Sequence, residues 1–477
     1  TWKKHSLVGL VGFSIEKYES DGLKASGSGF PDDQVLTNLN SAAKKNSISS
    51  SYSSNTLASF LSRLEYKFNN RYLLTLNFRA DGSSQFGPDK RWGYFPSGAV
   101  AWIITEENFM KDYSNIVSYL KLRGSVGKTG SQNLGAYDWR TLMGSATYNG
   151  AAGIVPSSLG NDILQWEEQI QKEVGLDYGF WDDRIRGTLG YYQKKVDNLL
   201  YSDPVPTSSS FSSVYQNIGS LKNRGIEFDV RVDIIKNVQK DLTWNVDFNI
   251  ARNRTTLEKL NSSDGYFGGG AYDYFKIEEG GETGRFYGYK DAGRLFMTNE
   301  ELVGLKTIDP KTGTLKYYRD DYNYERQGDV YIMDLDGDGQ ITADGDRTVI
   351  GNANPDFFGG FGSTLYWKGL MLNAVFSYSV GGDRFWDEEK NSSGDMNVYN
   401  TSNRILDSWT VNPGVNASYP RAMYYGWGSN SIITDRYIHD ASYLRMTALN
   451  LSYRLPKHLY KNSILNAVEF TFQATNL

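Results

Sequence analysis

The residues best suited to chemistry are three aspartates that alternate with other residues in one short segment. Asp334, Asp336 and Asp338 lie two positions apart, and Gly339 follows them directly. Ca²⁺ takes about six to eight oxygen ligands, and carboxylates spaced in this way on a tight turn supply several of them. Mg²⁺ fits less well because it requires near-ideal octahedral geometry. We therefore predict a calcium site here, with a turn that binds no ion as the alternative.

The residues that follow allow a comparison with known calcium loops. The spacing resembles the start of an EF-hand loop, in which acids occupy positions one, three and five. Gln340 would offer its carbonyl at position seven, but position twelve is Gly345 rather than an acid. A one-residue bulge would let Asp346 close the site instead. No helix-forming sequence flanks the segment, so we expect a calcium-stabilised loop and not a sensor.

A second group with binding potential is a set of aromatic residues in long polar segments. Aromatic rings stack on sugar faces, and loops on a rigid scaffold commonly carry ligand contacts. The alternative is that these side chains pack a loop, contact a partner or lie at a membrane interface. The candidates for substrate or partner contact are Tyr266, Tyr272, Tyr274, Phe385, Trp386, Tyr424 and Trp427.

Other kinds of chemistry find little support in the composition. The chain of 477 residues has no cysteine, which excludes disulfides and thiolate sites, and only three histidines, which disfavours a histidine-based centre. His439, Asp440 and Ser442 lie close together, but no nucleophile elbow accompanies them, so we predict no enzyme activity. Because the net charge is −5, we expect no nucleic-acid partner.

The elements that carry these residues are predicted to be long β-strands. Aromatic residues make up 14% of the chain, glycine is frequent at 49 residues and proline is rare at 11, a composition that favours strands and tight turns. In residues 58–68 apolar side chains alternate with polar ones, Asn69-Asn70 forms a turn, and residues 71–79 continue the alternation. Further hairpins with the same pattern lie at 174–191, 226–250, 365–378 and 443–472.

The connections between these strands differ at their two ends. One end has tight turns, and the other has long polar loops at about 20–55, 134–164, 261–355 and 381–432. Outer-membrane barrels combine short periplasmic turns, long extracellular loops, an apolar face toward lipid and a polar lumen. A soluble sandwich, the alternative, has loops of mixed length at both ends. We predict an all-β chain that is part of a transmembrane antiparallel β-barrel, with about fourteen strands of roughly 10–14 residues.

The two ends of the sequence resemble positions inside a larger barrel. A candidate strand begins near residue 7, and the chain stops at Ala474-Thr475-Asn476-Leu477, inside or just after a strand. Open sheet edges are not tolerated in lipid. We therefore expect residues 1–477 to be one partial barrel domain, with a plug domain and the final strands lying outside this sequence.

Several motifs resemble those of the SusC/RagA class of TonB-dependent outer-membrane transporters, and they occur in the family's order along nearly the whole chain. The motifs are Arg91-Trp92-Gly93-Tyr94-Phe95-Pro96-Ser97, Thr105-Glu106-Glu107-Asn108-Phe109-Met110, Leu122-Arg123-Gly124-Ser125-Val126-Gly127, Asn223-Arg224-Gly225-Ile226-Glu227 and Asp440-Ala441-Ser442-Tyr443-Leu444-Arg445. Each motif alone is weak evidence, but their joint order is specific.

The resemblance implies a larger assembly with a transport function. It implies a barrel of about 22 strands around an N-terminal plug, a Ton box that engages the TonB–ExbB–ExbD complex, and a SusD-like surface lipoprotein as a lid. It places the protein in the outer membrane of a Bacteroidota-type bacterium, in contact with lipid and lipopolysaccharide. The expected function is active import of oligosaccharides, glycans or peptides. The alternative is an outer-membrane barrel for binding or adhesion, or a porin-like barrel, without active transport.

Overall fold

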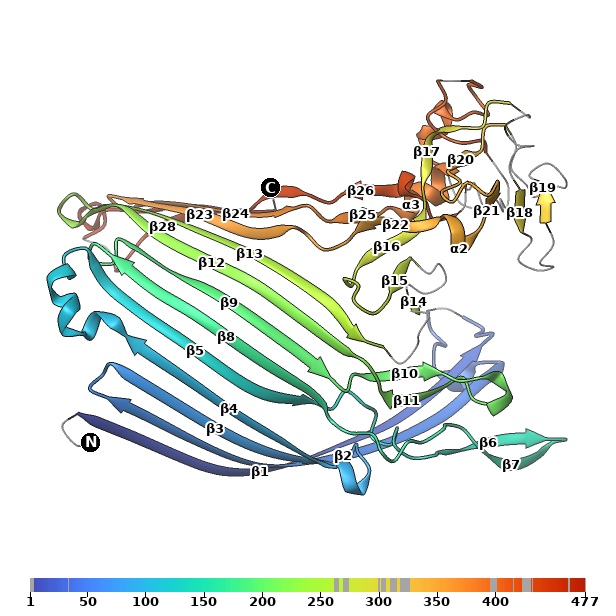
Figure 1. The fold of residues 1–477 in the computed structure, drawn as a ribbon, viewed down its shortest axis with the longest axis horizontal. Helices are drawn as coiled ribbons and strands as arrows, with labels where there is room; N and C mark the ends of the chain where they lie inside the picture. Colours follow the sequence, from blue (N-terminus) through green and yellow to red (C-terminus); the bar gives the residue numbers. More distant parts are fainter. Residues whose placement is uncertain are drawn as a thin grey trace. The chain divides into compact units, whose positions relative to one another are not determined.

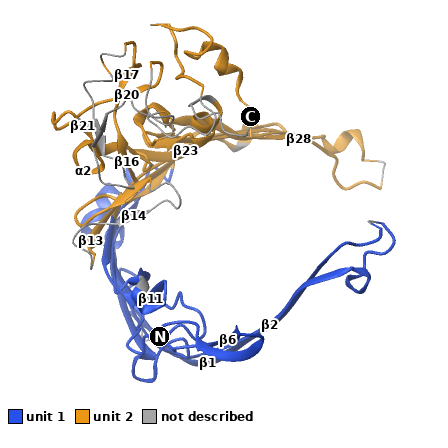
Figure 2. Ribbon diagram, turned by 90° about the vertical axis from the view of Figure 1, so that its right-hand side faces the viewer, with its two compact units in different colours: residues 1–183, 190–223 blue, residues 184–189, 224–477 orange. Residues whose placement is uncertain are grey.

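The structure is a computed structural model, in which the chain forms two compact units. It describes residues 4–32, 34–260, 266–268, 274–298, 301, 306–308, 315–317, 327–394, 401–414, 416–422, 430, 432–461 and 464–476. The first unit contains residues 1–183 and 190–223, and the second contains residues 184–189 and 224–477 (Figure 2). Within the described ranges, no helix is long and apolar enough to cross a membrane.

The first unit is built on a run of antiparallel strands hydrogen-bonded in the order β1-β2-β3-β4-β5-β8-β9, of which the first five residues of β9 belong to the second unit (Figure 1). Two smaller hairpins, β6–β7 and β10–β11, project from this run. The bounds are β1 (His5–Ser28), β2 (Lys44–Phe68), β3 (Tyr72–Ser83), β4 (Trp92–Ile103), β5 (Val117–Ser131), β6 (Met143–Tyr148), β7 (Ala151–Pro156), β8 (Glu167–Phe180), β9 (Ile185–Asp197), β10 (Leu200–Pro204) and β11 (Ser213–Asn217).

The second unit contains long antiparallel strands in the order β12-β13-β23-β24-β27-β28, and the first four residues of β12 belong to the first unit. These are β12 (Ser220–Asn237), β13 (Leu242–Lys259), β23 (Phe357–Trp367), β24 (Leu370–Val380), β27 (Tyr443–Arg454) and β28 (Glu469–Thr475). The described residues therefore contain thirteen long strands, close to the expected fourteen. The fold is mostly β-strand, and the long strands pair antiparallel, as the alternation predicts.

The loops between the long strands of the second unit contain short elements of their own. Between β13 and β23 lie β14 (Tyr266–Gly268), β15 (Phe275–Ile277), β16 (Arg285–Tyr289), β17 (Asp291–Leu295), β18 (Lys306–Ile308), β19 (Leu315–Tyr317), β20 (Val330–Ile332), β21 (Gln340–Ile341), the one-turn helix α2 (Ala343–Asp346) and β22 (Arg347–Asn352). Between β24 and β27 lie β25 (Asp383–Phe385), α3 (Asp387–Glu389) and β26 (Ile438–Asp440).

The tight turns lie where the sequence predicts them. Asn69 and Asn70 have positive φ angles of 52° and 57°, and Lys368 and Gly369 have 48° and 87°. Asparagine and glycine tolerate this left-handed conformation best, and two-residue hairpin turns require it. In the predicted hairpin at 226–250, β12 runs to Asn237 and β13 begins at Leu242, so residues 238–241 form the turn.

The predicted loop at 20–55 is wrong in its extent. β1 continues to Ser28 and β2 begins at Lys44, so these two strands have 24 and 25 residues and exceed the predicted 10–14. The pairing is regular through this region, with Lys24 opposite Ser49. This segment is rich in serine and lacks an apolar face, so the alternation that marks a half-buried strand is absent. Backbone pairing to β1 and side-chain hydrogen bonds, such as that from the Tyr52 hydroxyl to Glu19 Oε1 at 3.0 Å, hold it in place.

The two faces of the long strands differ in chemistry. One face is apolar and exposed, as shown by Val11 at 85% and Ile15 at 67% exposure in β1. The opposite face carries ion pairs between and within strands. Lys121 Nζ lies 3.1 Å from Asp177 Oδ2, and Arg123 pairs with both Asp177 and Glu173. Further ion pairs of this kind are Arg63–Glu65, Arg79–Asp81 and Arg231–Asp233.

Each unit has a buried cluster that holds parts of its long loops in place. In the first unit Phe86, Phe95, Leu164 and Trp166 pack together, and the rings of Phe95 and Trp166 meet edge to face at 5.4 Å. In the second unit the cluster contains Leu295, Phe296, Val330, Ile332 and Ile341. Such clusters give a long loop the fixed position that a binding site needs.

Candidate functional site

Three of the five predicted calcium ligands converge. The carboxylates of Asp334, Asp336 and Asp338 each offer an oxygen, and these oxygens all lie within 4.8 Å of one another. The loop is held from both sides, because it connects β20 to β21 and both Ile332 and Ile341 belong to the buried cluster. Local spacing and a fixed frame together produce a compact group of hard oxygens, which is the donor type that Ca²⁺ prefers.

Backbone N–H groups shape the acid loop. Asp334 accepts hydrogen bonds from the N–H of Gly337 at 2.7 Å and of Gly339 at 2.8 Å, and Asp336 accepts one from the N–H of Asp338 at 3.1 Å. Gly337 and Gly339 have φ angles of 76° and 79°, a left-handed conformation that glycine adopts at little cost. The glycines therefore make the turn that draws the aspartates together.

The electrostatics of the loop are those of crowded carboxylates. The backbone N–H of Asp338 lowers the pKa of Asp336, but desolvation and repulsion from the carboxylates of Asp338 and Asp346 outweigh it. The net result is a pKa of Asp336 raised above its ordinary value. A divalent cation at this position would relieve the repulsion between the carboxylates.

Asp346 holds the loop by hydrogen bonds to its backbone. It is fully buried, its Oδ1 accepts from the N–H of Leu335 at 2.7 Å, and its Oδ2 accepts from the N–H of Thr342 at 2.6 Å. It lies outside the group of three converging carboxylates. The side chain of Gln340 lies outside the described residues.

One sequence expectation about this loop is wrong. A one-turn helix, α2, follows the acid loop directly, although no helix-forming sequence was expected there. Thr342 caps it, and its hydroxyl accepts a hydrogen bond from the N–H of Gly345. A threonine three residues before the bonded N–H is the signal of such a cap.

The candidate aromatic residues play different roles where the structure describes them. The rings of Tyr274 and Phe385 lie 4.6 Å apart, and the Tyr274 hydroxyl donates to Asp387 Oδ1 at 3.1 Å. These two side chains therefore pack between the loop that follows β13 and the loop that follows β24. Trp386 is more accessible, at 39% exposure, with the Arg404 guanidinium 4.8 Å from its ring. Of the other candidates, Tyr272, Tyr424, Trp427 and the side chain of Tyr266 lie outside the described residues.

A polar network around Glu389 was not predicted. Glu389 is buried at 7% exposure and pairs with Arg404, while the Tyr419 hydroxyl donates to its Oε1 at 3.1 Å. His439 Nε2 lies 2.5 Å from the other carboxylate oxygen. The four residues are far apart in the sequence, so no local motif predicts this network.

The same network explains the neighbouring His439, Asp440 and Ser442. The Ser442 hydroxyl donates to Asp440 Oδ1 at 2.5 Å, whereas the described partner of the His439 ring nitrogen is Glu389. A serine nucleophile needs a base within hydrogen-bond reach. The three residues thus form local structural contacts in place of a relay from histidine to serine.

Comparison with known proteins identifies relatives over the whole chain. The model of the family described as "TonB dependent receptor-like, beta-barrel" matches residues 4–477. A TonB-dependent receptor of Formosa agariphila is 31% identical, over 99% of this chain and 47% of the relative. The TonB-dependent receptor SusC of Bacteroides thetaiotaomicron is 32% identical, over 88% of this chain and 40% of the relative.

A solved structure has the same fold. The structure of the RagAB peptide transporter aligns with a TM-score of 0.80 and 27% identity, over 99% of this chain and 49% of that chain. The present chain therefore spans about half the length of the relatives that it matches.

Proposed function

This chain belongs to the TonB-dependent receptor β-barrel family, of the SusC/RagA type, and lies in the outer membrane, and we propose that it forms the barrel part of an active importer. The observation that carries the proposal is the fold shared with the RagAB peptide transporter along the whole chain. Import, its energy source and its partners are proposed for the whole protein, because this chain covers about half of its relatives.

The proposed cycle uses the loops for capture and other components for movement. Extracellular loops and a SusD-like lipoprotein lid enclose the ligand, and TonB, energised by ExbB and ExbD, pulls on a plug to open a path. The substrates are oligosaccharides, glycans or peptides. The exposed Trp386 ring beside Arg404 supports this range, because an aromatic face stacks on sugars and a guanidinium binds carboxylates. The protein makes and breaks no covalent bond in this cycle.

We further propose that the acid loop of Asp334, Asp336 and Asp338 binds Ca²⁺ as a structural ion. The support is the convergence of three carboxylates on a loop whose backbone is already arranged. Three protein carboxylates leave room for a backbone carbonyl or water among the about six to eight ligands of Ca²⁺. The ion would stabilise the loop and take no part in transport chemistry.

Uptake by living cells tests the importer proposal. Cells that express the full-length protein receive a fluorescent oligosaccharide or peptide, with and without an uncoupler of the proton-motive force. Accumulation that the uncoupler abolishes is the expected result. Binding without accumulation would favour the adhesion alternative, and accumulation that the uncoupler leaves unchanged would favour a porin-like barrel.

A matched pair of variants tests the role of the exposed tryptophan. Trp386→Ala is expected to weaken ligand binding about two- to tenfold, the loss of one stacking contact. Trp367→Ala, which removes a 49% exposed tryptophan at the tight turn after β23, serves as the control. Equal binding by both variants would remove Trp386 from the ligand site and leave the importer proposal standing.

A further inference from the structure

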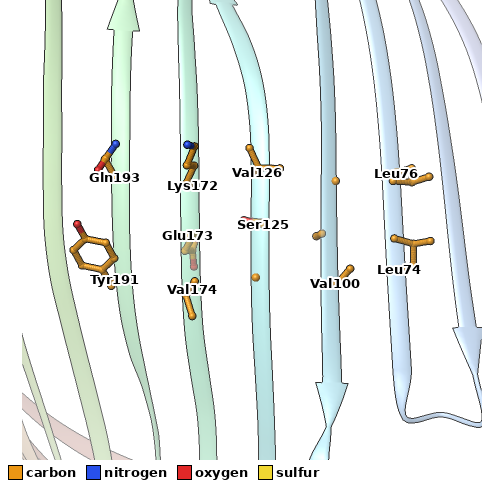
Figure 3. A pocket seen from close by; sticks show the side chains of 13 residues that line it. Leu74, Leu76, Val100, Ser125, Val126, Lys172, Glu173, Val174, Tyr191 and Gln193 are labelled. Carbon is orange, nitrogen blue, oxygen red and sulfur yellow. The ribbon is translucent and has the colours of Figure 1, made fainter.

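An apolar groove runs across five strands of the first unit. It has a volume of ≈ 690 Å³ and is lined by residues of β3, β4, β5, β8 and β9 (Figure 3). This volume falls within the range of about 300–1,000 Å³ that is typical of ligand pockets. Most of the lining is hydrocarbon, from Leu74, Leu76, Val100, Val126 and Val174.

Two glycines create the hollow. Gly98 lies between Leu76 and Val126, and Gly124 lies between Val100 and Val174 in the strand register. A Cβ atom added at Gly98 would meet its nearest neighbour at 3.4 Å, and one at Gly124 at 3.8 Å, which are ordinary contacts. Neither the backbone conformation nor contacts with neighbouring atoms require glycine at these two positions. The effect of the two glycines is therefore to leave a hollow in the surface.

Other glycines of the same unit show the contrast. A Cβ atom at Gly93 or Gly130 would overlap the ring of Phe95, so the buried cluster demands glycine there. Gly98 and Gly124 serve no such packing. Because these two glycines have no side chains, they leave open space on an otherwise continuous apolar face.

The groove opens on the face that meets lipid. Val100, Val126 and Val174 are 59%, 51% and 57% exposed, and they share the apolar face of the strands. The ion pairs of Lys121 and Arg123 with Asp177 occupy the opposite face. In an outer-membrane barrel, hydrocarbon chains cover the apolar face.

A lysine stands at one end of the groove. Figure 3 shows Lys172 level with Gln193 and Val126, one row away from Tyr191 and Val174. Within the part of the chain that the structure describes, Lys172 makes no hydrogen bond or ion pair. Lys128 and Lys195 do have acidic partners, at 2.6 Å and 3.0 Å. An unpaired lysine ammonium group beside lipid is stabilised by an anionic partner.

The position of Lys172 along the strand indicates one leaflet. β8 begins at Glu167, directly after the long connection that contains β6 and β7, and ends at Phe180 before the tight turn at 181–183. Long connections of such barrels are extracellular and short turns are periplasmic. Lys172 therefore lies on the outer-leaflet side of the groove.

We propose that the groove binds an acyl chain of a phosphorylated glycolipid of the outer leaflet, that is, lipopolysaccharide, with its phosphate at Lys172. The hydrocarbon chain fills the space over Gly98 and Gly124. The flexible lysine stem reaches along the surface and presents its ammonium at the level of the head group. Gln193 lies beside it and offers an amide to the sugar hydroxyls.

Binding of purified lipid A to the full-length protein tests the site. The protein is purified from outer membranes, stripped of lipid by detergent exchange and titrated by native mass spectrometry with lipid A, with its dephosphorylated form and with phosphatidylglycerol. Lys172→Met is expected to weaken lipid A binding roughly fivefold, the effect of about one cation at an anionic surface. The same variant is expected to leave the dephosphorylated form unaffected.

The groove itself is tested by filling it. The double variant Gly98→Leu/Gly124→Leu is expected to weaken binding of both forms of lipid A, since both use the same hollow. Controls on the same face are Lys17→Met, which removes a lysine paired with Glu19, and Val11→Leu. Retained β-sheet circular dichroism verifies folding of every variant. Equal lipid A affinity of wild type and all variants would overturn the proposal, as would phosphatidylglycerol binding as tightly as lipid A.

Discussion

The Nε2 atom of His439 lies 2.5 Å from Oε2 of Glu389, which connects β26 to the short helix α3. The other carboxylate oxygen of Glu389 is used by Arg404 and Tyr419. One buried carboxylate therefore joins four segments of the 381–440 region. Because it is the shared partner, its loss would leave three polar groups without their common acceptor.

The first prediction concerns this carboxylate. Glu389→Ala is expected to lower the free energy of local opening by about 1.5–3 kcal/mol, the contribution of hydrogen bonds to a charged group. Hydrogen–deuterium exchange should show faster exchange at residues 383–389 and 438–440, with β23 and β24 unchanged. The neighbouring Glu388 is exposed, so Glu388→Ala is the control and should exchange like the wild type. Matching exchange in both variants would contradict the role assigned to Glu389.

The second prediction concerns calcium. Asp336→Ala is expected to lower calcium affinity in isothermal titration calorimetry and to increase mobility around Gly345, because it removes the central carboxylate of three. Asp344→Ala removes an exposed carboxylate outside the group and should bind as the wild type does. Identical binding by the Asp336 variant, or no binding by any form, would show that the loop is not a calcium site.

The third prediction separates the frame of the loop from its ligands. Asp346→Ala removes the acceptor of two backbone N–H groups, so it should destabilise the loop by roughly 2 kcal/mol or more. The loss should persist in the presence of a chelator, since these hydrogen bonds do not depend on an ion. Hydrogen–deuterium exchange of residues 334–346 with excess chelator measures it. An effect seen only with calcium present would instead assign Asp346 to the ion.

The fourth prediction is a pH dependence at Glu278. Lys276 and Arg285, whose nitrogens lie 2.9 Å and 2.5 Å from its carboxylate, hold the pKa of Glu278 below its ordinary value of 4.5. A carboxyl with a lowered folded pKa contributes stability above the unfolded pKa and loses it as pH falls through the folded value. Amide protection at residues 275–277 should therefore decrease as the pH drops below 4.5. In Glu278→Gln this acid-dependent part should be absent, and its persistence would exclude Glu278 as the cause.

The strands could be predicted because the physics that defines them is local. Period-two alternation predicted the positions of the strands. Asparagine and glycine, which tolerate a positive φ angle, predicted turns such as Asn69-Asn70. The paired ends of β1 and β2 were missed because serine-rich strands that project beyond the apolar band show no alternation. Strand length there depends on the partner strand and not on the segment itself.

The candidate sites also differ in whether local sequence is enough to predict them. The acid loop was predictable because its three carboxylates lie within five consecutive residues. The Glu389 network was not, since it assembles residues up to 50 positions apart. The groove over Gly98 and Gly124 also needs the register of several strands, and a glycine in a sequence does not reveal whether its neighbours leave space.

The paired charges on the polar face have an electrical consequence. Lys121 and Arg123 are balanced by Asp177 and Glu173 within a few ångströms. Neutral groupings of this kind produce a potential that decays much faster with distance than that of a single ion. A charged cargo passing this stretch of wall would feel it only at contact. Raising the ionic strength from 0.1 M to 1 M shortens the Debye length from about 10 Å to about 3 Å. This change should therefore have the same effect on the passage rate of charged cargo as on that of neutral cargo.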